Sequence, residues 1–290
     1  MKIIRVGSRD SKLAIIQTKL VMDAIERFDK NIKTELITMK TTGDIILDKS
    51  LDKIGGKGLF VKELDEALLN NMVDITVHSY KDMPMEINAD LPIAAVSERE
   101  DARDVLILPK TKIDETKPIG CSSKRRVLQL SQLGYVNNTA PIRGNVISRL
   151  RKLDEGQYSA LVLAAAGIKR LGLTERIDKF FSTEEIMPAA CQGIIAVQAR
   201  KGEKVDYLRG FHCEKAKQIA DAERAFVAAL DGGCSSPVAA YAVIEQGKLV
   251  LNGLYVDEKN GIMRKGCMSG EIKDAKEIGA ALAYKLKEEV

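Results

Sequence analysis

The chain has 290 residues, of which 45% are hydrophobic and 30% charged, and its net charge is +4, a composition typical of a folded protein of two or three domains. No apolar run approaches the ~18 residues that a membrane span needs, and the first residues lack the layout of a signal peptide, so we expect a cytoplasmic protein. Five widely spaced cysteines and two histidines exclude a disulfide framework and a histidine-rich metal site, so we expect no bound metal.

The first hundred residues predict an α/β domain with parallel strands. A strand-like stretch is followed by apolar residues at helical spacing and then by a second strand-like stretch, the usual opening of such a domain. The predicted elements are strands over 3–6, 33–39 and 74–78 and helices over 13–25 and 59–69, and a further strand is predicted just beyond them over 104–108.

Residues 41–58 contain four glycines and several charged side chains, which predicts a mobile loop. Its run Gly55-Gly56-Lys57-Gly58 invites comparison with a phosphate-binding loop. The run lacks the GxxxxGK[ST] spacing, so a nucleotide site is not expected there.

Positive charge is concentrated in residues 118–176, which hold ten basic and three acidic side chains, whereas the rest of the chain sums to −3. Three strand-to-helix junctions are predicted in this segment, at residues 119–123, 140–145 and 167–170. In open α/β sheets ligands bind at such edges, where helix N-termini add partial positive charge. The segment therefore predicts an anion-binding site.

The basic segment also fits two alternatives to a small-anion site. One is a solvated helical face, which fits Arg149, Arg151 and Lys152 in part. The other is a nucleic-acid site, but the aromatic content is only 4% and no nucleic-acid-binding motif is present. Arginine suits bidentate pairing with carboxylates or phosphates, which favours a small anionic ligand.

The C-terminal part predicts a small α+β domain. A helix rich in alanine and a tight glycine-containing loop precede strands that alternate as in an antiparallel sheet, with turns at 246–247 and 259–260. The predicted elements are helices over 214–230 and 274–289 and strands over 238–244, 248–257 and 261–268.

Three single residues are candidates for chemistry. Asp82 precedes Met83-Pro84, where the simplest interpretation is a turn-forming aspartate; alternatively its carboxylate faces the basic cleft and moves protons or stabilises a cation. Cys234 stands in a polar loop where a thiol is accessible. Cys121 competes with it, because the basic residues at 124–126 could lower the pKa of its thiol. Local sequence does not separate the two cysteines.

Short motifs along essentially the whole chain resemble the porphobilinogen deaminase family, also called hydroxymethylbilane synthases. Each motif is weak alone, but the ordered set is highly specific. The motifs are Gly7-Ser8-Arg9 with Ser11 and Leu13-Ala14, the run from Gly55 to Glu63, the run from His78 to Pro84, Ser122-Ser123 with Arg125-Arg126, Arg143-Gly144-Asn145, Ala165-Ala166-Gly167 with Arg170-Leu171-Gly172, Gln192-Gly193, Glu223-Arg224 and Gly232-Gly233-Cys234.

The resemblance implies an α/β protein with a two-lobed core like that of type II periplasmic-binding proteins, plus a small C-terminal α+β domain. The first domain would comprise residues 1–97 and 194–212 and carry a mobile loop at 42–60. The second would comprise the basic residues 98–193, and the third residues 213–290. The family also implies a monomer.

The resemblance implies an activity as well. Members of the family condense four porphobilinogen molecules head to tail, with release of ammonia, to give the linear tetrapyrrole hydroxymethylbilane of haem-type biosynthesis. They use a dipyrromethane cofactor bound covalently through a cysteine thioether, and Cys234 matches that cysteine. Asp82 matches the catalytic aspartate, and a carboxylate there would stabilise the cation left when ammonia departs.

The resemblance also implies a role for the basic residues, which is to bind the acetate and propionate groups that each substrate molecule carries. The residues implied in binding substrate are Arg9, Ser11, Arg149, Arg170 and Gln192. Those implied in binding the cofactor are Lys81, Asp82, Ser122, Arg125, Arg126, Arg143 and Cys234, and those in the mobile loop are Lys53, Lys57 and Phe60.

Two rival classes predict something different. A non-enzymatic anion-binding protein with the same two-lobed fold would normally be exported and would leave the third domain without a role. A nucleic-acid-binding protein would use the basic segment and bind in a salt-dependent manner. Neither rival predicts a covalent adduct.

Overall fold

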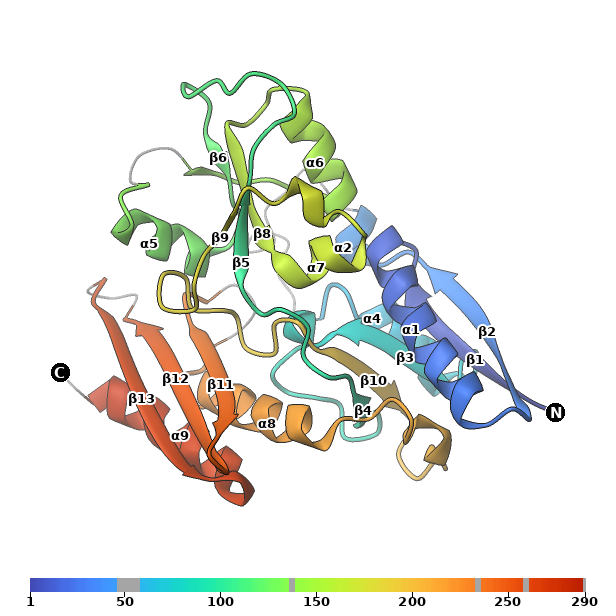
Figure 1. Ribbon diagram of the computed structural model, residues 1–290. Coiled ribbons are helices and arrows are strands. Elements are labelled where there is room, and N and C mark those ends of the chain that lie inside the picture. Colours follow the sequence, from blue (N-terminus) through green and yellow to red (C-terminus); the bar gives the residue numbers. More distant parts are fainter. Residues whose placement is uncertain (46–57, 136–138, 233–235, 258–260, 289–290) are drawn as a thin grey trace. The chain divides into compact units, whose positions relative to one another are not determined.

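The structure is a computed structural model that describes residues 1–45, 58–135, 139–232, 236–257 and 261–288 (Figure 1). The predicted site residues Lys53, Lys57 and Cys234 and the turn predicted at 259–260 lie outside these ranges. The chain divides into two compact units: unit 1 comprises residues 1–100 and 194–216, and unit 2 comprises residues 101–193 and 217–290. The division into three domains stays a prediction.

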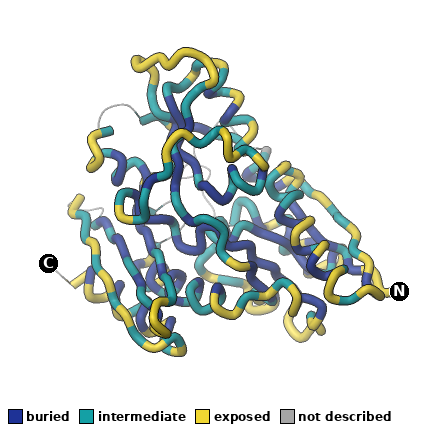
Figure 2. The backbone as a smooth tube through the Cα atoms, viewed as in Figure 1, coloured by how far each residue is buried: buried dark blue, intermediate teal, exposed yellow. Residues whose placement is uncertain are grey.

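Unit 1 is built on a five-stranded mixed sheet with the order β2-β1-β3-β10-β4. Strand β1 lies between β2 and β3 and is parallel to both, as predicted, whereas β10 lies between β3 and β4 and is antiparallel to both. Every residue of β10 is buried, which Figure 2 shows as a dark blue strand. The bounds are β1 Lys2–Arg9, β2 Ile32–Met39, β3 Ile75–Ser79, β4 Ile93–Val96 and β10 Ile195–Ala199.

The helices of unit 1 bury one apolar side against this sheet. In α1 the side chains of Val21 and Ile25 are fully buried and pack with those of the strands. Ser11 caps α1 by accepting a hydrogen bond from Ala14 N at 3.3 Å. The predicted helix over 59–69 begins later, at Lys62. The bounds are α1 Lys12–Phe28, α2 Thr42–Ile45, α4 Lys62–Leu69, η1 Tyr80–Asp82 and η3 Asp206–Leu208.

Unit 2 contains a second five-stranded sheet with the order β7-β6-β8-β5-β9. Here β6 is parallel to β7 and β8, and β5 runs antiparallel to β8. In both sheets, three neighbouring strands are parallel and the next strand along the sheet is antiparallel to them. This shared pattern confirms the predicted two-lobed α/β core. The bounds are β5 Asp104–Ile107, β6 Ile119–Gly120, β7 Thr139–Ala140, β8 Ala160–Ala164 and β9 Lys179–Phe180.

Alternation along β8 explains how helices cover both faces of this sheet. Leu161 and Leu163 pack in one buried cluster with residues of α6 and α7, whereas Val162 packs in another with Leu130 of α5. Strand β8 ends at Ala164, because the following alanines already belong to a helix. The bounds are α5 Lys124–Gln132, α6 Val146–Asp154, α7 Ala165–Arg170 and η2 Thr174–Arg176.

The C-terminal residues of unit 2 form the predicted small α+β arrangement, a three-stranded antiparallel sheet with two helices. Gln246 and Gly247 both have positive φ angles, of 49° and 78°, as a two-residue hairpin turn requires. The bounds are α8 Glu214–Ala229, β11 Ala239–Glu245, β12 Lys248–Val256, β13 Met263–Glu271, η4 Ile272–Asp274 and α9 Ala275–Glu288. Within the described ranges, no helix is both long and apolar enough to cross a membrane.

Candidate functional site

Predicted site residues of unit 1 lie at the carboxyl-terminal edge of its sheet. Strands β1, β2 and β3 are parallel, so their carboxyl ends share one edge. Arg9 ends β1, and Lys81 and Asp82 directly follow β3. Ser11 also lies here, but its hydroxyl caps α1. The strand order therefore explains why residues more than seventy positions apart belong to one edge.

The turn that carries Asp82 is anchored on both sides. Tyr80 and Met83 are 3% and 1% exposed, and Met83 N donates to Tyr80 O at 3.2 Å. Tyr80 N also donates to Ile194 O at 3.0 Å. The side chain of Asp82 is only partly buried. A rigid turn thus presents a partly exposed carboxylate at the sheet edge.

Arg9 is held by two neighbours at the same edge. Its Nε donates to Asp44 Oδ2 at 3.0 Å, and its Nη2 donates to Asp44 Oδ1. The Phe60 ring centroid lies 4.3 Å from Arg9 Cζ. Asp44 follows β2, the strand next to β1, and this explains the contact. Sequence reasoning missed Asp44, whose pairing spans 35 positions.

His78 lies in β3 and is 6% exposed. Burial lowers the pKa of its imidazole to about 3, and the charge of Arg9 adds to this effect. Its Nε2 lies 3.0 Å from Thr76 Oγ1. His78 is therefore a neutral interior side chain under this edge of the sheet at neutral pH.

In unit 2 the predicted residues follow three strands in the manner expected. Ser122 follows β6, Arg143 and Arg149 follow β7, and Arg170 ends the helix that begins where β8 stops. Because β6, β7 and β8 are parallel, these residues lie at one sheet edge. The first two junctions predicted in the basic segment are thereby confirmed, whereas the third lies earlier than predicted, because α7 already begins at Ala165.

Hydrogen bonds hold the connections after β6 and β7 in a defined shape. Ser122 Oγ donates to Ile142 O at 2.6 Å and accepts from Ile142 N at 2.8 Å. Arg149 Nε donates to Gly144 O at 2.7 Å, and the N-cap Asn145 accepts from Ser148 N at 3.0 Å. The edge therefore combines ordered main-chain turns with guanidinium and hydroxyl donors.

Arg125 and Arg126 differ from the other arginines of the predicted site because they are 4% and 8% exposed and meet one buried carboxylate. Asp104 is fully buried; its Oδ2 lies 2.8 Å from Arg125 Nη1, and its Oδ1 accepts from Arg126 Nη2 at 2.7 Å. Gln192 Nε2 donates to the same Oδ1 at 2.9 Å. Asp104 starts β5, and the antiparallel direction of β5 brings it to the carboxyl end of β8.

The electrostatics of this cluster follow from the pairing. Burial alone would raise the pKa of Asp104, but the charges of Arg125 and Arg126 outweigh that effect and hold the pKa well below its ordinary value. Asp104 lies outside residues 118–176 in the sequence. By pairing with Arg125 and Arg126, its carboxylate offsets part of the positive charge of that segment. Sequence reasoning missed Asp104, which stands in the sequence as the polar start of an apolar strand.

One electrostatic expectation proves wrong. The basic neighbours of Cys121 were expected to be able to lower its pKa, but burial raises the pKa of this thiol despite the charges of Arg126 and Arg125. Cys121 is 3% exposed and packs with Leu130 and Phe181. Its environment is that of a small core side chain.

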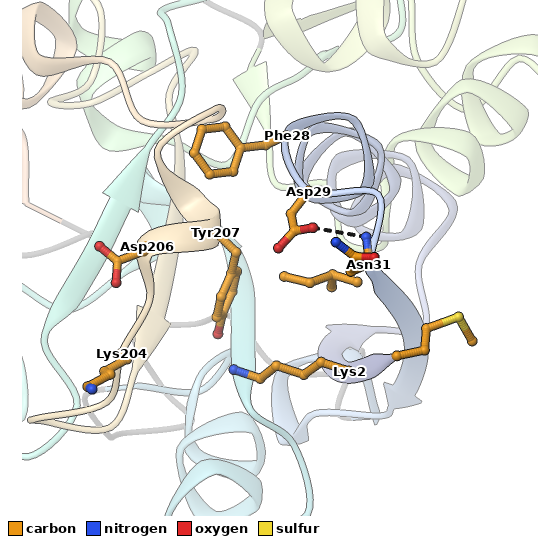
Figure 3. A pocket seen from close by; sticks show the side chains of 9 residues that line it. Lys2, Phe28, Asp29, Asn31, Lys204, Asp206 and Tyr207 are labelled. Carbon is orange, nitrogen blue, oxygen red and sulfur yellow. Dashed lines mark hydrogen bonds between the residues drawn. The ribbon is translucent and has the colours of Figure 1, made fainter.

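A separate pocket of unit 1 contains none of the predicted site residues (Figure 3). Lys2 and Lys204 line it together with Asp29 and Asp206, so its charges are mixed. The Lys2 amine lies 5.2 Å from the centroid of the Tyr207 ring. The edge of the unit 2 sheet differs from this pocket in its excess of cationic side chains, which are Arg125, Arg126, Arg143, Arg149 and Arg170.

The unit 2 edge of this α/β protein is rich in cationic donors and suits a ligand with several carboxylates, and the unit 1 edge combines Arg9 and Lys81 with the carboxylate of Asp82. Comparison with known proteins identifies the family. Residues 4–206 match the family model described as porphobilinogen deaminase, dipyromethane cofactor binding domain, and residues 217–288 match the porphobilinogen deaminase C-terminal domain.

Relatives of the same name cover nearly the whole chain. The porphobilinogen deaminase of Ruminiclostridium cellulolyticum is 61% identical over 99% of this chain and 98% of its own length. That of Alkaliphilus oremlandii is 59% identical over 99% and 97%, and that of Roseiflexus castenholzii is 42% identical over 97% and 94%. The chain belongs to the porphobilinogen deaminase family.

Proposed function

We propose that the protein is a transferase that joins four porphobilinogen molecules head to tail, releases ammonia and yields hydroxymethylbilane in tetrapyrrole biosynthesis. Membership of the family along nearly the whole chain supports this function. The structural observation that carries the mechanism is the anchored turn after β3, which presents the Asp82 carboxylate at a sheet edge shared with Arg9.

The reaction needs a group that stabilises positive charge. The C–N bond of the substrate aminomethyl group breaks while its nitrogen is protonated, the electron pair leaves with nitrogen, and the leaving group departs as ammonia. The remaining azafulvenium cation is attacked by the α-carbon of the preceding pyrrole ring, and a C–C bond forms. That carbon then loses its proton. Asp82 would stabilise the cation through the pyrrole N–H group and take part in the proton transfers.

Arginine and serine side chains would bind the acetate and propionate groups. For substrate, the proposed residues are Arg9, Ser11, Arg149, Arg170 and Gln192. For the cofactor, they are Lys81, Asp82, Ser122, Arg125, Arg126 and Arg143. The donor chemistry at the edge of unit 2 fits a polycarboxylate, since guanidinium and hydroxyl donors follow three adjacent parallel strands.

We propose Cys234 as the residue that binds a dipyrromethane cofactor covalently. The cofactor supplies the first acceptor ring for the growing chain. The buried position and raised pKa of Cys121 disfavour that alternative thiol. The proposal includes the three predicted domains, the loop at 42–60 with Lys53, Lys57 and Phe60, a monomeric state and a cytoplasmic location.

Intact-protein mass spectrometry tests the proposal. Freshly purified wild-type protein should carry the mass of a two-pyrrole adduct, and the Cys234→Ala variant should show the bare chain. Cys267→Ala is the control, because it removes an exposed thiol and should keep the adduct. A bare chain in wild-type protein that converts porphobilinogen would refute the cofactor assignment, and failure to convert porphobilinogen would refute the function.

A further inference from the structure

We propose that Asp44 is a positioning residue that orients the Arg9 guanidinium toward a substrate carboxylate. The inference rests on the proposed function in one respect, namely that Arg9 binds substrate. It adds a role for a side chain outside the predicted set of site residues.

The pairing geometry leaves a usable edge on Arg9. A guanidinium has five N–H donors in a fixed plane. Asp44 accepts one hydrogen bond from Nε and one from Nη2, so it occupies the side edge of the group. The Nη1 donors and the second Nη2 donor lie on the end edge, which is a fork of the width that suits a carboxylate. Arg9 can therefore bind Asp44 and a substrate carboxylate together.

Phe60 restrains the guanidinium from a second direction. Its ring centroid is 4.3 Å from Arg9 Cζ, a cation–π distance. The ring also packs against Gly43, where an added Cβ would lie 2.3 Å from Phe60 Cε1. Gly43 N donates to Leu59 O at 2.9 Å, which joins the segments that carry Asp44 and Phe60. Asp44 therefore fixes the orientation of the Arg9 guanidinium within its own plane, and the Phe60 ring covers one face of that plane.

Asp44 is itself ordered. Thr41 is fully buried, and its Oγ1 donates to Asp44 Oδ2 at 2.7 Å. Burial raises the pKa of Asp44, but the hydrogen bonds and charge of Arg9 and the hydrogen bonds of Thr41 outweigh this, so that its pKa lies below the ordinary value. The carboxylate is therefore ionised at neutral pH and holds Arg9 before any ligand arrives. Such preorganisation reduces the ordering cost of binding.

A double-mutant cycle tests the assignment with porphobilinogen as the probe. Asp44→Asn should raise KM about tenfold, the scale of a lost charged hydrogen bond, while kcat changes by less than about threefold. Arg9→Lys should raise KM as well, because lysine lacks the fork. In the Arg9→Lys background, Asp44→Asn should change KM by less than about twofold, since Asp44 acts through Arg9.

A matched pair on the same strand provides the control. Arg5 also binds an aspartate through two nitrogens, with Nη2 2.8 Å and Nε 3.2 Å from Asp74. Asp74 precedes β3 and so lies at the opposite end of that strand from Asp82. Asp74→Asn should leave KM unchanged, even where it lowers thermal stability.

A second variant keeps the test independent of folding. Thr41→Val preserves the shape of a buried side chain but removes the hydroxyl that orients Asp44, so KM should rise in the same direction by a smaller factor. Additive effects of Asp44→Asn and Arg9→Lys, or unchanged KM in both Asp44→Asn and Thr41→Val, would overturn the proposal. Absence of turnover in the wild type would instead refute the proposed function.

Discussion

Gln17 and Ser79 exchange hydrogen bonds of 3.1 Å between α1 and the last residue of β3. Gln17 is 4% exposed and Ser79 is partly buried, and the pair links a helix to the strand that leads to Asp82. With the main-chain hydrogen bonds of Tyr80, it holds the turn without any contribution from the Asp82 charge. The position of Asp82 and its chemistry can therefore be tested separately.

Asp82→Asn should nearly abolish turnover and leave the fold intact. The amide has the size of the carboxylate but neither stabilises a cation by charge nor accepts a proton near neutral pH. We expect kcat to fall by roughly 10²–10⁴-fold, the usual scale for loss of an acid–base group. Steady-state kinetics with porphobilinogen and thermal unfolding measure the two effects.

The matched control for that variant is Asp90→Asn. Asp90 is an exposed aspartate in the same connection between β3 and β4, and its substitution should leave kcat unchanged. Near-normal turnover of the Asp82→Asn variant would refute the catalytic role of Asp82.

Asp104→Asn should strongly destabilise the protein. The variant leaves two adjacent buried arginines without their counter-ion, and breaking a buried ion pair costs about 3–5 kcal/mol. Urea unfolding at neutral pH measures the change in the free energy of unfolding. Asp154→Asn breaks a more exposed pair with Arg176 and should cost about 1 kcal/mol or less. Equal losses in the two variants would contradict the assignment of a buried, mutually dependent cluster.

His78 should make the stability depend on pH. Its pKa is about 3 in the folded protein and near the ordinary 6.5 when unfolded, so between these values the unfolded state binds more protons. Stability should therefore fall as the pH drops from 6.5 toward 3. Between pH 6.5 and 4.5 this contribution should reach roughly 2 kcal/mol.

His78→Gln isolates that contribution, because glutamine does not titrate. The difference in unfolding free energy between wild type and variant should shrink or reverse as the pH is lowered from 6.5 to 4.5. Urea denaturation of both proteins at each pH measures it. Parallel pH profiles would show that His78 does not carry the effect.

Gly279→Ala should destabilise unit 2, although alanine is normally the better helix former by about 1 kcal/mol. An added Cβ would lie 2.2 Å from Ala222 O and 2.9 Å from Phe226 N, and both of these atoms belong to the main chain of α8. The two helices would have to separate, at a cost of roughly 1–3 kcal/mol. Ala281→Ser, at an exposed position of the same helix, is the control for urea unfolding. Increased stability of Gly279→Ala would contradict the close approach.

Local patterns were sufficient for the parallel strands and for the residues that follow them. The spacing of apolar side chains predicted α1, β2 and the three junctions of the basic segment, because each signal lies within about fifteen residues. The short strands β4, β9 and β10 were missed, since segments of two to five residues are too short to show a period of apolar side chains.

The partners of the arginines were missed for a different reason. Asp104 meets Arg126 across 22 positions and Gln192 across 88, and Asp44 meets Arg9 across 35. No local pattern distinguishes these aspartates from solvated ones. Only the strand order shows that the start of β5 and the end of β8 coincide. Residue type and family resemblance were enough to predict the arginines of the site. Their aspartate partners could be found only from the order of the strands in the sheets.

The position of β10 between β3 and β4 also affects the order in which the protein can fold during synthesis. β3 and β4 are made within the first hundred residues, yet the strand that joins them is made almost a hundred residues later. Until then both strands have an open edge, which in a nascent chain is a surface for wrong pairing. The sheet of unit 1, at whose edge Asp82 lies, can therefore be completed only after the strands of the second sheet have been synthesised. A truncated message that ends before residue 195 cannot give a complete unit 1 sheet.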